Sequence, residues 1–261
     1  LSRQISSQPD ARESDVLVSS GEQVSIALLA MTLKDMGYPA CSLLGYQIQI
    51  ETDDAYGRAR IKNVQTTRLL NDLKDGTIIV VAGFQGVDAR GNITTLGRGG
   101  SDTSAVAIAA ATQADACEIY TDVDGVYSAD PRIYPHAHKL ARISYDEMLE
   151  LASLGAKVLQ IRSVELAKRY QVPVHVRSSF TTDEGTWLVQ EDQSMEDVIV
   201  SGVTSDLDQA KITLQRVPDR PGLAAKLLMP IAQDNVVVDM IIQNASADEK
   251  TDMTFTVPEG D

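Results

Sequence analysis

A glycine-rich segment at residues 97–103 has the sequence Gly-Arg-Gly-Gly-Ser-Asp-Thr and runs directly into the apolar stretch 105–111. A glycine-rich turn that opens a buried helix presents several backbone N–H groups at the positive end of the helix dipole, so an anion is expected to bind there. Arg98 would add a formal positive charge. The alternative is that Ser101 or Asp102 caps the helix and the glycines only shape a turn. That alternative leaves Arg98 and three glycines in four positions unexplained, so an anion-binding site is favoured.

A second candidate segment, residues 121–132, has the sequence Thr-Asp-Val-Asp-Gly-Val-Tyr-Ser-Ala-Asp-Pro-Arg. It begins at the end of a predicted strand over 117–121, and open α/β sheets bind ligands at the carboxyl ends of their strands. Its carboxylates, its tyrosine and its arginine would suit a nucleotide with its metal ion. The Asp-x-Asp-Gly core also resembles a calcium loop, but that pattern requires a glutamate where Ile133 stands and a helix in place of the predicted strand.

Two single charged residues lie at predicted helix starts. Glu22 is in the first turn of the amphipathic helix predicted over 23–36, where an acidic residue commonly caps the helix or stabilises its dipole. A structural role is therefore the simpler interpretation of Glu22. Lys157 begins the helix predicted over 156–170, where its charge opposes the dipole unless an anion lies beside it. Lys157 therefore slightly favours a binding role.

The composition narrows the classes of partner. The chain has 261 residues, with 23 Lys and Arg against 37 Asp and Glu, which gives a formal net charge of −14 and a pI near 4.6. This charge would repel nucleic acid and anionic membranes, so neither is expected as a partner. No apolar run approaches the roughly 18 residues of a membrane span. The sequence predicts a soluble globular protein.

Disulfide, zinc and common hydrolase sites find little support in the sequence. Cys41 and Cys117 are the only cysteines, and each lies in an apolar stretch, as is typical of buried thiols in a reducing cytosol. The three histidines lack the spacing of zinc ligands. The chain also lacks a P-loop, a Gly-x-Ser-x-Gly elbow and a Gly-x-Gly-x-x-Gly turn after a strand, so hydrolase and Rossmann oxidoreductase interpretations lose their main support.

The hydrophobic pattern from residue 14 to about residue 189 alternates short β-branched runs with helical stretches, which indicates parallel βαβ units. The apolar run 77–82 predicts a central strand buried on both faces. Residues 117–121 and 172–176 predict further strands, and Pro173 places the second of them near an edge. Helical periodicity predicts helices over residues 23–36, 66–74, 102–113, 145–154 and 156–170.

A polar, acidic stretch near residue 190 predicts a boundary between two units. The second unit, of about 70 residues, has a ββαββ pattern and is marginal as an independent fold, so it is expected to pack against a partner. Its predicted strands lie at residues 198–203, 210–215, 236–242 and 253–257, and its predicted helix lies at 222–234.

Four motifs, in the same order, resemble the aspartokinase family of the amino acid kinase superfamily over essentially the whole chain. The first two are the segments 97–103 and 121–132, and the third is Gly-Ala-Lys-Val-Leu at 155–159. The fourth, Val-Pro-Asp-Arg-Pro-Gly at 217–222 followed by Val-Asp-Met-Ile-Ile-Gln-Asn at 238–244, is similar to the ACT regulatory domain of that family. Related carbamate, acetylglutamate and uridylate kinases share the catalytic fold but lack this pairing with an ACT unit.

The resemblance implies an α/β fold in two domains. Residues 1–190 would form an amino acid kinase-like three-layer αβα domain with a mainly parallel sheet, and residues 191–261 a ferredoxin-like βαβ ACT domain. Both are expected to be truncated, because the family begins with a strand ending in Lys-Phe-Gly-Gly-Thr-Ser, whose lysine contacts the transferring phosphates, and usually has a second ACT unit. A chain that begins at Leu1 is therefore expected to turn over little.

The resemblance also implies phosphorylation of the side-chain carboxylate of L-aspartate with ATP and Mg²⁺, giving 4-phospho-L-aspartate for lysine, threonine and methionine synthesis in the cytoplasm. Arg98 would hold a substrate carboxylate and Glu22 the ammonium group, with Ser101 nearby. Asp102 would lie at the transfer site and organise a lysine or Mg²⁺; it would not accept a proton, because the attacking carboxylate is already ionised near neutral pH. The implied ATP-binding residues are Thr121, Asp122, Tyr127, Arg132 and Lys157.

In the ACT unit, the resemblance implies an effector pocket for lysine, threonine or both, and a homodimer or α2β2-type assembly through this unit. The implied effector-binding residues are Asp219, Gly222, Ala224, Asp239 and Gln243. Without the resemblance, an ordinary turn at 219–222 and a polar edge-strand residue at Gln243 would be the simpler interpretation. A noncatalytic regulatory fragment and another kinase of the superfamily are the alternatives, and the retained substrate and ATP motifs favour the aspartate kinase.

Overall fold

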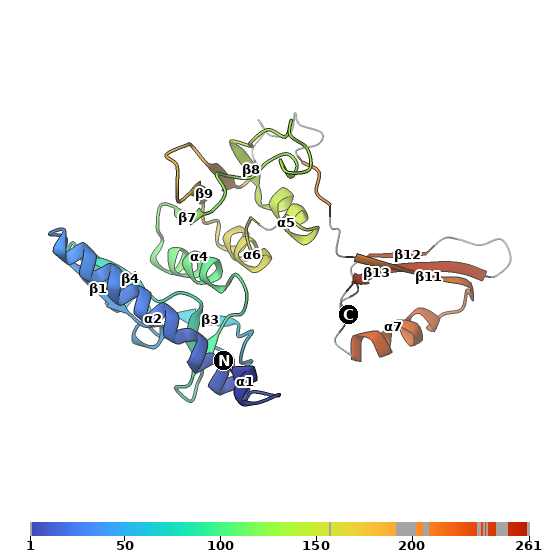
Figure 1. Cartoon of the computed structure of the whole chain (residues 1–261), viewed down its shortest axis with the longest axis horizontal. Coiled ribbons are helices and arrows are strands. Elements are labelled where there is room, and N and C mark those ends of the chain that lie inside the picture. Colours follow the sequence, from blue (N-terminus) through green and yellow to red (C-terminus); the bar gives the residue numbers. More distant parts are fainter. Residues whose placement is uncertain are drawn as a thin grey trace. The chain divides into compact units, whose positions relative to one another are not determined.

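The structure is a computed structural model, and it describes residues 2–156, 158–191, 202–205, 209–233, 236, 238, 240–243 and 250–259. The chain forms two compact units, Leu1–Thr204 and Ser205–Asp261 (Figure 1). The boundary between them lies later than the one predicted near residue 190. Residues just before this boundary still contact the rest of the first unit, since the N–H of Val203 donates to the carbonyl of Ser128 at 2.7 Å.

The first half of the first unit contains two small sheets. In one of them, β1 (Ala40–Leu43) pairs in parallel with β4 (Ile78–Val81). The other has the order β3-β2-β5-β6 and consists of β2 (Ile50–Thr52), β3 (Ile61–Val64), β5 (Gln85–Val87) and β6 (Ile93–Thr95). A short helix, α1 (Ser2–Ile5), precedes these sheets, and η1 (Gly45–Ile48) follows β1. A small buried core of Leu43, Ile48, Ile50 and Leu69 holds this half together.

Strand β4 differs from its prediction. The apolar run 77–82 predicted a central strand buried on both faces, but in the described part of the chain β4 pairs only with β1, and Ile78 is 40% exposed. Helices α2 (Ala11–Asp35) and α3 (Thr67–Lys74) pack against it. An apolar run indicates nonpolar neighbours for a strand, but it does not indicate how many strands lie beside it.

The second half of the first unit is built on a four-stranded sheet. Its strands are β7 (Cys117–Thr121), β8 (Arg142–Ser144), β9 (Val174–Ser178) and β10 (Thr186–Val189), in the order β7-β9-β10-β8. Strand β9 is parallel to β7 and antiparallel to β10, and β10 is parallel to β8. The sheets of the unit are therefore mixed. Among the described strands the pairs β1–β4, β2–β5, β7–β9 and β8–β10 are parallel, and the pairs β2–β3, β5–β6 and β9–β10 are antiparallel, so the predicted parallel pairing forms the larger part but not the whole.

Strand β9 is an inner strand of this sheet, and the edge position predicted from Pro173 is also wrong. Pro173 lies one residue before the strand, so its missing N–H removes no hydrogen bond from the ladder. Its carbonyl accepts from the N–H of Cys117 at 2.8 Å, at the point where the pairing with β7 begins.

Three helices pack on one face of the four-stranded sheet. They are α4 (Gly100–Thr112), α5 (Tyr145–Ser153) and α6 (Ile161–Tyr170). Their buried residues, among them Val106, Met148 and Val164, pack with the inward-facing Ile119 and Val176 of the strands. Helix α6 begins later than the predicted start at residue 156, so the Lys157 segment precedes the helix.

Helix α2 begins at Ala11, well before the start predicted at residue 23. By length and composition it could cross a membrane, although the sequence has no continuous apolar run of that length. However, Asp15, Ser19 and Ile26 on one side of the helix are buried in the unit. A buried carboxylate needs hydrogen-bond donors, and Asp15 finds them in the backbone of the same unit. We therefore interpret α2 as a helix of that globular unit.

The second unit has one helix and one antiparallel sheet. The elements are β11 (Gln209–Pro218), α7 (Leu223–Gln233), β12 (Ile241–Gln243) and β13 (Lys250–Pro258), and β13 lies between the other two strands. The predicted strands 210–215 and 253–257 lie within β11 and β13. Of the strand predicted over 236–242, residues 241 and 242 lie in β12, residues 236, 238 and 240 are not in a strand, and residues 237 and 239 lie outside the described residues. Of the strand predicted over 198–203, residues 202 and 203 are not in a strand and the rest lie outside the described residues.

Candidate active site

The glycine-rich turn between β6 and α4 depends on close approaches of the backbone. Gly97 has φ +80°, and a Cβ there would lie 2.9 Å from the carbonyl oxygen of Gly57. Gly99, the N-cap of α4, has φ +65°, and a Cβ there would lie 2.5 Å from Cβ of Gln160. Both positions therefore require glycine, for conformation and for space. Packing explains these glycines, but it does not explain Arg98 between them.

Arg98 is exposed, and its guanidinium forms no hydrogen bond or ion pair with the described residues. Ser101, also exposed, lies in the first turn of α4, where backbone N–H groups have no partner inside the helix. The turn therefore offers a free guanidinium, a hydroxyl and a helix N-terminus to a ligand, and this is a favourable environment for a carboxylate or a phosphate.

Asp102 lies in the same first turn but faces a different environment. Its side chain is half-buried, and this burial raises the pKa of its carboxyl group, while a hydrogen bond from the backbone N–H of Gln160 opposes the rise. Burial, together with the charge of Asp102, raises the pKa of the Cys117 thiol to about 11. An ionised Asp102 is therefore costly in this position unless a cation binds beside it.

The predicted nucleotide-binding residues lie on a loop that starts at the carboxyl end of β7. Thr121 ends the strand, and its hydroxyl donates to Oδ1 of Asp122 at 3.1 Å. Arg132 donates to both carboxylate oxygens of Asp130, and its side chain is 89% exposed. The hydrogen bond to Asp130 and the nearby charges of Asp130 and Asp122 raise the pKa of Arg132. A phosphate would have to compete with Asp130 for this guanidinium.

Tyr127 is held by two residues that the sequence analysis did not single out. Its hydroxyl donates to Oδ2 of Asp124 at 3.0 Å, and Nζ of Lys139 lies 3.3 Å from the same oxygen. Burial, and then the hydrogen bond to Asp124, raise the pKa of Tyr127. The backbone bridge between Tyr127 and Lys139 shows why they meet, since the loop folds back as a hairpin. A polar pair across an unpredicted hairpin leaves no local sequence signal.

The remaining predicted residues are less well placed by the structure. Glu22 lies in the middle of α2, so its interpretation as a first-turn dipole or capping residue is wrong; Glu13 occupies the first turn. Glu22 is half-buried, and no described contact joins it to Arg98. Lys157 lies outside the described residues. The predicted nucleotide-binding loop, residues 121–132, which we call the nucleotide loop, likewise shares no described side-chain contact with the Arg98 turn.

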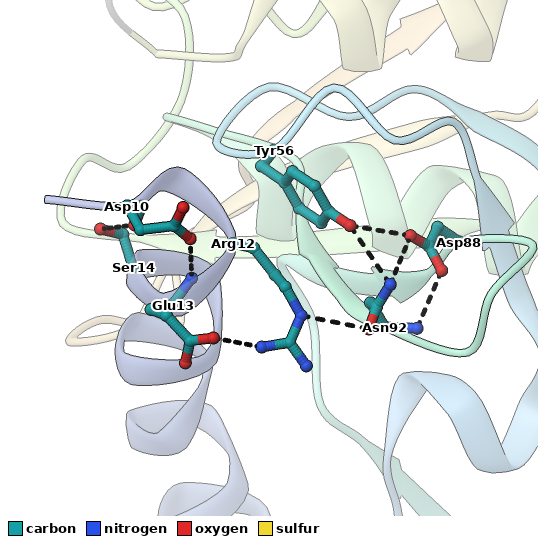
Figure 2. A network of polar contacts seen from close by, with 7 residues as sticks. All are labelled: Asp10, Arg12, Glu13, Ser14, Tyr56, Asp88 and Asn92. Carbon is teal, nitrogen blue, oxygen red and sulfur yellow. Dashed lines mark hydrogen bonds and ion pairs between the residues drawn. The ribbon is translucent and has the colours of Figure 1, made fainter.

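Helix α2 is fastened at its N-terminal end by a polar network (Figure 2). Arg12 donates from Nε to Oδ1 of Asn92 at 3.1 Å, and it also binds Glu13. Asn92 and the hydroxyl of Tyr56 both donate to Oδ2 of Asp88, at 3.0 and 2.9 Å. This network ties the first turn of α2 to the β5–β6 hairpin and to the loop that carries Tyr56.

The predicted effector residues lie in the second unit. Asp219 and Gly222 are in the exposed turn between β11 and α7, and Gly222 has φ +84° one residue before the helix. Ala224 lies in the first turn of α7, and Gln243 ends β12. Asp239 lies outside the described residues. A Cβ on Gly222 would meet no other atom within 4 Å, and the structure describes no contact between Gly222 and Gln243.

The described residues contain no group of three or more His, Cys, Asp or Glu side chains arranged for a metal ion. Proteins commonly bind Mg²⁺ through one or two carboxylates together with substrate phosphates, so a nucleotide-borne Mg²⁺ does not need such a group. Asp122 and Asp124, at the start of the nucleotide loop, have the chemistry to serve in this way.

Comparison with known proteins defines the class of this protein. A model of the amino acid kinase family matches residues 2–178. The chain therefore belongs to the amino acid kinase family. Within the family it is similar to aspartate kinases: it is 56% identical to those of Stutzerimonas stutzeri and Pseudomonas aeruginosa over all of its own length. The chain spans 64% of the length of these relatives.

Solved structures give the same result. The aspartate kinase from Synechocystis is 46% identical, with a TM-score of 0.65 over 98% of this chain and 44% of that one. The E. coli aspartokinase III in complex with lysine and aspartate is 29% identical, with a TM-score of 0.78 over 95% of this chain and 56% of that one. The fold of the first unit is thus an amino acid kinase-like α/β fold.

Proposed function

We propose that the complete protein that carries this chain is an aspartate kinase, which transfers the γ-phosphoryl group of ATP to the side-chain carboxylate of L-aspartate. The observation that carries this proposal is the exposed guanidinium of Arg98, which has no partner among the described residues and lies on a glycine turn at the N-terminus of α4. That arrangement suits an anionic substrate, and the chain is similar to aspartate kinases from one end to the other.

Substrate binding is assigned to residues of the turn and of α2. Arg98 binds a carboxylate of aspartate by a charge-assisted contact, and Ser101 contributes its hydroxyl at the same helix terminus. Glu22 binds the ammonium group. The structure of E. coli aspartokinase III in complex with lysine and aspartate supports aspartate as the ligand class.

ATP binding is assigned to the loop after β7. Arg132 and Lys157 neutralise phosphate charge, and the Tyr127 side chain, fixed by Asp124, contributes to the nucleotide pocket. The remaining proposed contacts are those of Thr121 and Asp122. Mg²⁺ enters with the phosphates, and Asp122 is the carboxylate best placed on the loop to assist it. A related structure, E. coli aspartokinase III in complex with aspartate and ADP, supports this ligand class.

The reaction then needs positioning more than acid–base chemistry. A carboxylate oxygen of aspartate forms the new P–O bond while the bond from the γ-phosphorus to the β–γ bridging oxygen breaks, and ADP leaves with that electron pair. The attacking carboxylate is ionised at neutral pH, so no proton has to be removed. The protein's task is to bring two anions together and to neutralise their charge. Asp102 organises a cation at this point, which would offset the cost of its burial.

The second unit is proposed to be an ACT regulatory domain that binds lysine, threonine or both. Gly222 leaves the N-terminus of α7 open for the effector's carboxylate, and Asp219, Ala224, Asp239 and Gln243 complete the proposed pocket. Pairing of this unit in a homodimer or an α2β2-type assembly would place the pocket at an interface. The kinase so regulated would act in the synthesis of lysine, threonine and methionine.

The test is a substrate panel with the complete protein. Aspartate with ATP and Mg²⁺ should give an acyl phosphate, trapped as its hydroxamate, whereas N-acetylglutamate, carbamate and UMP should not be phosphorylated. Phosphorylation of one of those three, or none with aspartate, would contradict the proposal. A noncatalytic regulatory protein would show effector binding without turnover of any acceptor.

A further inference from the structure

Two backbone segments, residues 57–59 and 95–97, meet at the buried residues Ala59 and Thr95, just before Arg98, and we call their meeting point the junction. The N–H of Ala59 donates to the carbonyl of Thr95 at 2.9 Å. Both of these residues are at most 1% exposed. The position of Arg98 at the surface is therefore set by a packed, buried piece of backbone that cannot shift freely.

Asp15 of α2 holds one side of the junction. Its Oδ2 accepts from the N–H of Gly57 at 3.0 Å and from the N–H of Thr95 at 2.8 Å, and its Oδ1 accepts from the Thr95 hydroxyl at 2.7 Å. Asp15 is 2% exposed, so these donors replace the water that a carboxylate normally binds. One turn earlier, Arg12 anchors the same helix to Asn92 (Figure 2).

Arg162 of α6 holds the other side of the junction. Its Nη1 donates to the carbonyl of Leu96 and its Nη2 to the carbonyl of Ala59, both at 2.7 Å. Arg162 lies in the first turn of α6, where a positive charge opposes the helix dipole. The two carbonyl acceptors account for an arginine in this unfavourable position, because one planar guanidinium can bind both.

Gln160, the N-cap of α6, extends this connection to the turn itself. Its Nε2 donates to the carbonyl of Arg98 at 2.8 Å, and its side chain packs where a Cβ on Gly99 would lie. The start of α6 is therefore attached to Leu96, just before the turn, through Arg162, and to the turn itself through Gln160.

We infer that Asp15 and Arg162 are positioning residues for the kinase reaction. Together they form a clamp on the junction that fixes Arg98 relative to α2, which carries Glu22, and relative to the start of α6. This inference rests on the proposed function, which assigns a substrate carboxylate to Arg98. Neither residue touches the substrate.

Loss of one side of the clamp should weaken aspartate binding selectively. Without Arg162, the buried carbonyls of Leu96 and Ala59 lose their donor, and the backbone that leads into the turn gains freedom. Arg98 then occupies its productive position for a smaller fraction of the time, which raises the apparent dissociation constant for aspartate. The nucleotide loop after β7 shares no described side-chain contact with the junction, so ATP binding should change much less.

Two measurements on the complete protein test the inference. We expect Arg162→Ala to raise KM for aspartate about tenfold, which corresponds to about 1.4 kcal/mol, and to leave KM for ATP within about twofold. Hydrogen exchange of the unliganded protein should accelerate about tenfold at the amides of residues 96–101 and remain at the parent rate in β7. For Arg162→Lys, KM for aspartate and the exchange rate at residues 96–101 should lie between those of the parent and of Arg162→Ala. A lysine retains the positive charge but lacks the planar guanidinium that binds two carbonyls at once.

The matched control is Arg169→Ala, on the same helix. Arg169 is exposed and contacts the ring of Tyr170, so its loss should leave both KM values and the exchange of the turn unchanged. If Arg162→Ala does not fold, Thr95→Val decides, because it removes only the hydroxyl bond to Asp15 and should produce a smaller change of the same kind.

Unchanged exchange at 96–101 together with a parent-like KM for aspartate in a folded variant would overturn the inference. An equal rise of KM for aspartate and KM for ATP, with faster exchange throughout the first unit, would also overturn the inference. That pattern is expected when a residue only stabilises the fold. The exchange measurement needs no turnover. A parent protein that does not phosphorylate aspartate would therefore contradict the proposed function, and the exchange data would still test whether the clamp holds the turn.

Discussion

Asp15, on α2, and Arg162, on α6, bind the same junction, and in the described part of the chain no ion pair joins them. The carboxylate takes the N–H donors of the junction and the guanidinium takes its carbonyl acceptors. Each charge is thus neutralised by backbone dipoles rather than by the other charge, so the two helices α2 and α6 are linked through the segment that leads to Arg98. That link holds the backbone that leads to Arg98, whose own side chain has no partner in the part of the chain that the structure describes.

Arg98→Ala should weaken aspartate binding far more than ATP binding. Removing a charge-assisted, bidentate contact to a carboxylate costs on the order of 2–4 kcal/mol, so KM for aspartate should rise by a factor between about 30 and 1,000. Steady-state kinetics of the complete protein with each substrate varied in turn would measure this. Arg90→Ala, which removes an exposed arginine paired with Asp54, is the control. If KM for aspartate and kcat of Arg98→Ala both stay within twofold of the parent, Arg98 does not bind the substrate carboxylate.

The elements of the first unit that could be predicted from the sequence are those whose local hydrophobic pattern matches their burial in the folded unit. The strand over 117–121 is found as predicted, and α4 differs from its prediction only at its ends, because an apolar run bounded by turns is a local signal. The first turns of α2 were missed for the opposite reason. Their polar residues, such as Asp15, serve distant backbone groups near Thr95, and a hydrogen bond over 80 positions leaves no periodicity to detect.

The same distinction applies to the candidate site. Residues 97–103 and the nucleotide loop could be found because glycines and carboxylates cluster within a few positions. Arg162 and Gln160 could not, since their function is visible only where their side chains meet Leu96 and Arg98. The roles predicted for single charged residues depend on where the helices are predicted to start. Because α2 begins at Ala11, the interpretation of Glu22 as a first-turn residue is wrong.

Asp102→Asn should abolish most of the activity and at the same time stabilise the fold near neutral pH. Burial raises the folded-state pKa of this carboxyl, so the ionised form costs stability above that pKa, and the cost disappears as the pH falls below the unfolded value of about 3.9. The asparagine variant should therefore unfold at a higher temperature at pH 7, with a difference that shrinks toward pH 3. Loss of a group at the transfer site should lower kcat by about 100-fold or more.

Thermal unfolding at several pH values and the hydroxamate assay measure the two effects of Asp102→Asn. The control is Asp115→Asn, an exposed carboxylate just after α4, which should change neither. A variant of Asp102 that is destabilised at pH 7, or one that retains parent-like kcat, would contradict the corresponding part of this prediction.

Asp88→Asn should destabilise the first unit in a way that depends on pH. Burial alone would raise the pKa of Asp88, but hydrogen bonds from Asn92, Tyr56 and the backbone of Arg90 outweigh it and lower the pKa to about 2. The ionised form therefore stabilises the folded state fully above the unfolded value of about 3.9, and this contribution is lost as the pH falls through about 2. An asparagine would also place an amide donor against donors, at a cost of about 1–3 kcal/mol.

Urea unfolding of the parent and of Asp88→Asn at pH 7, 4 and 3 would measure this effect. The difference in unfolding free energy should be largest at pH 7 and decrease toward pH 3. Asp54→Asn, which alters only an exposed ion pair on the neighbouring loop, is the matched control and should show little change at any pH. A difference for Asp88→Asn that grows on acidification would refute the assignment of a depressed pKa.

Gln243→Ala tests the proposed effector pocket. Gln243 ends β12 and is exposed, so its truncation should leave the fold of the second unit intact while it removes a polar contact to an amino acid effector. Feedback inhibition requires that the effector bind the less active arrangement better, typically by about 1–3 kcal/mol, so loss of one contact should raise the inhibition constant about tenfold. Calorimetric titration of the complete protein with lysine and with threonine, together with inhibition kinetics, measures both steps. Gln215→Ala, an exposed glutamine in β11 of the same unit, is the control. If neither amino acid binds the parent, or if Gln243→Ala retains the parent's inhibition profile, the pocket lies elsewhere.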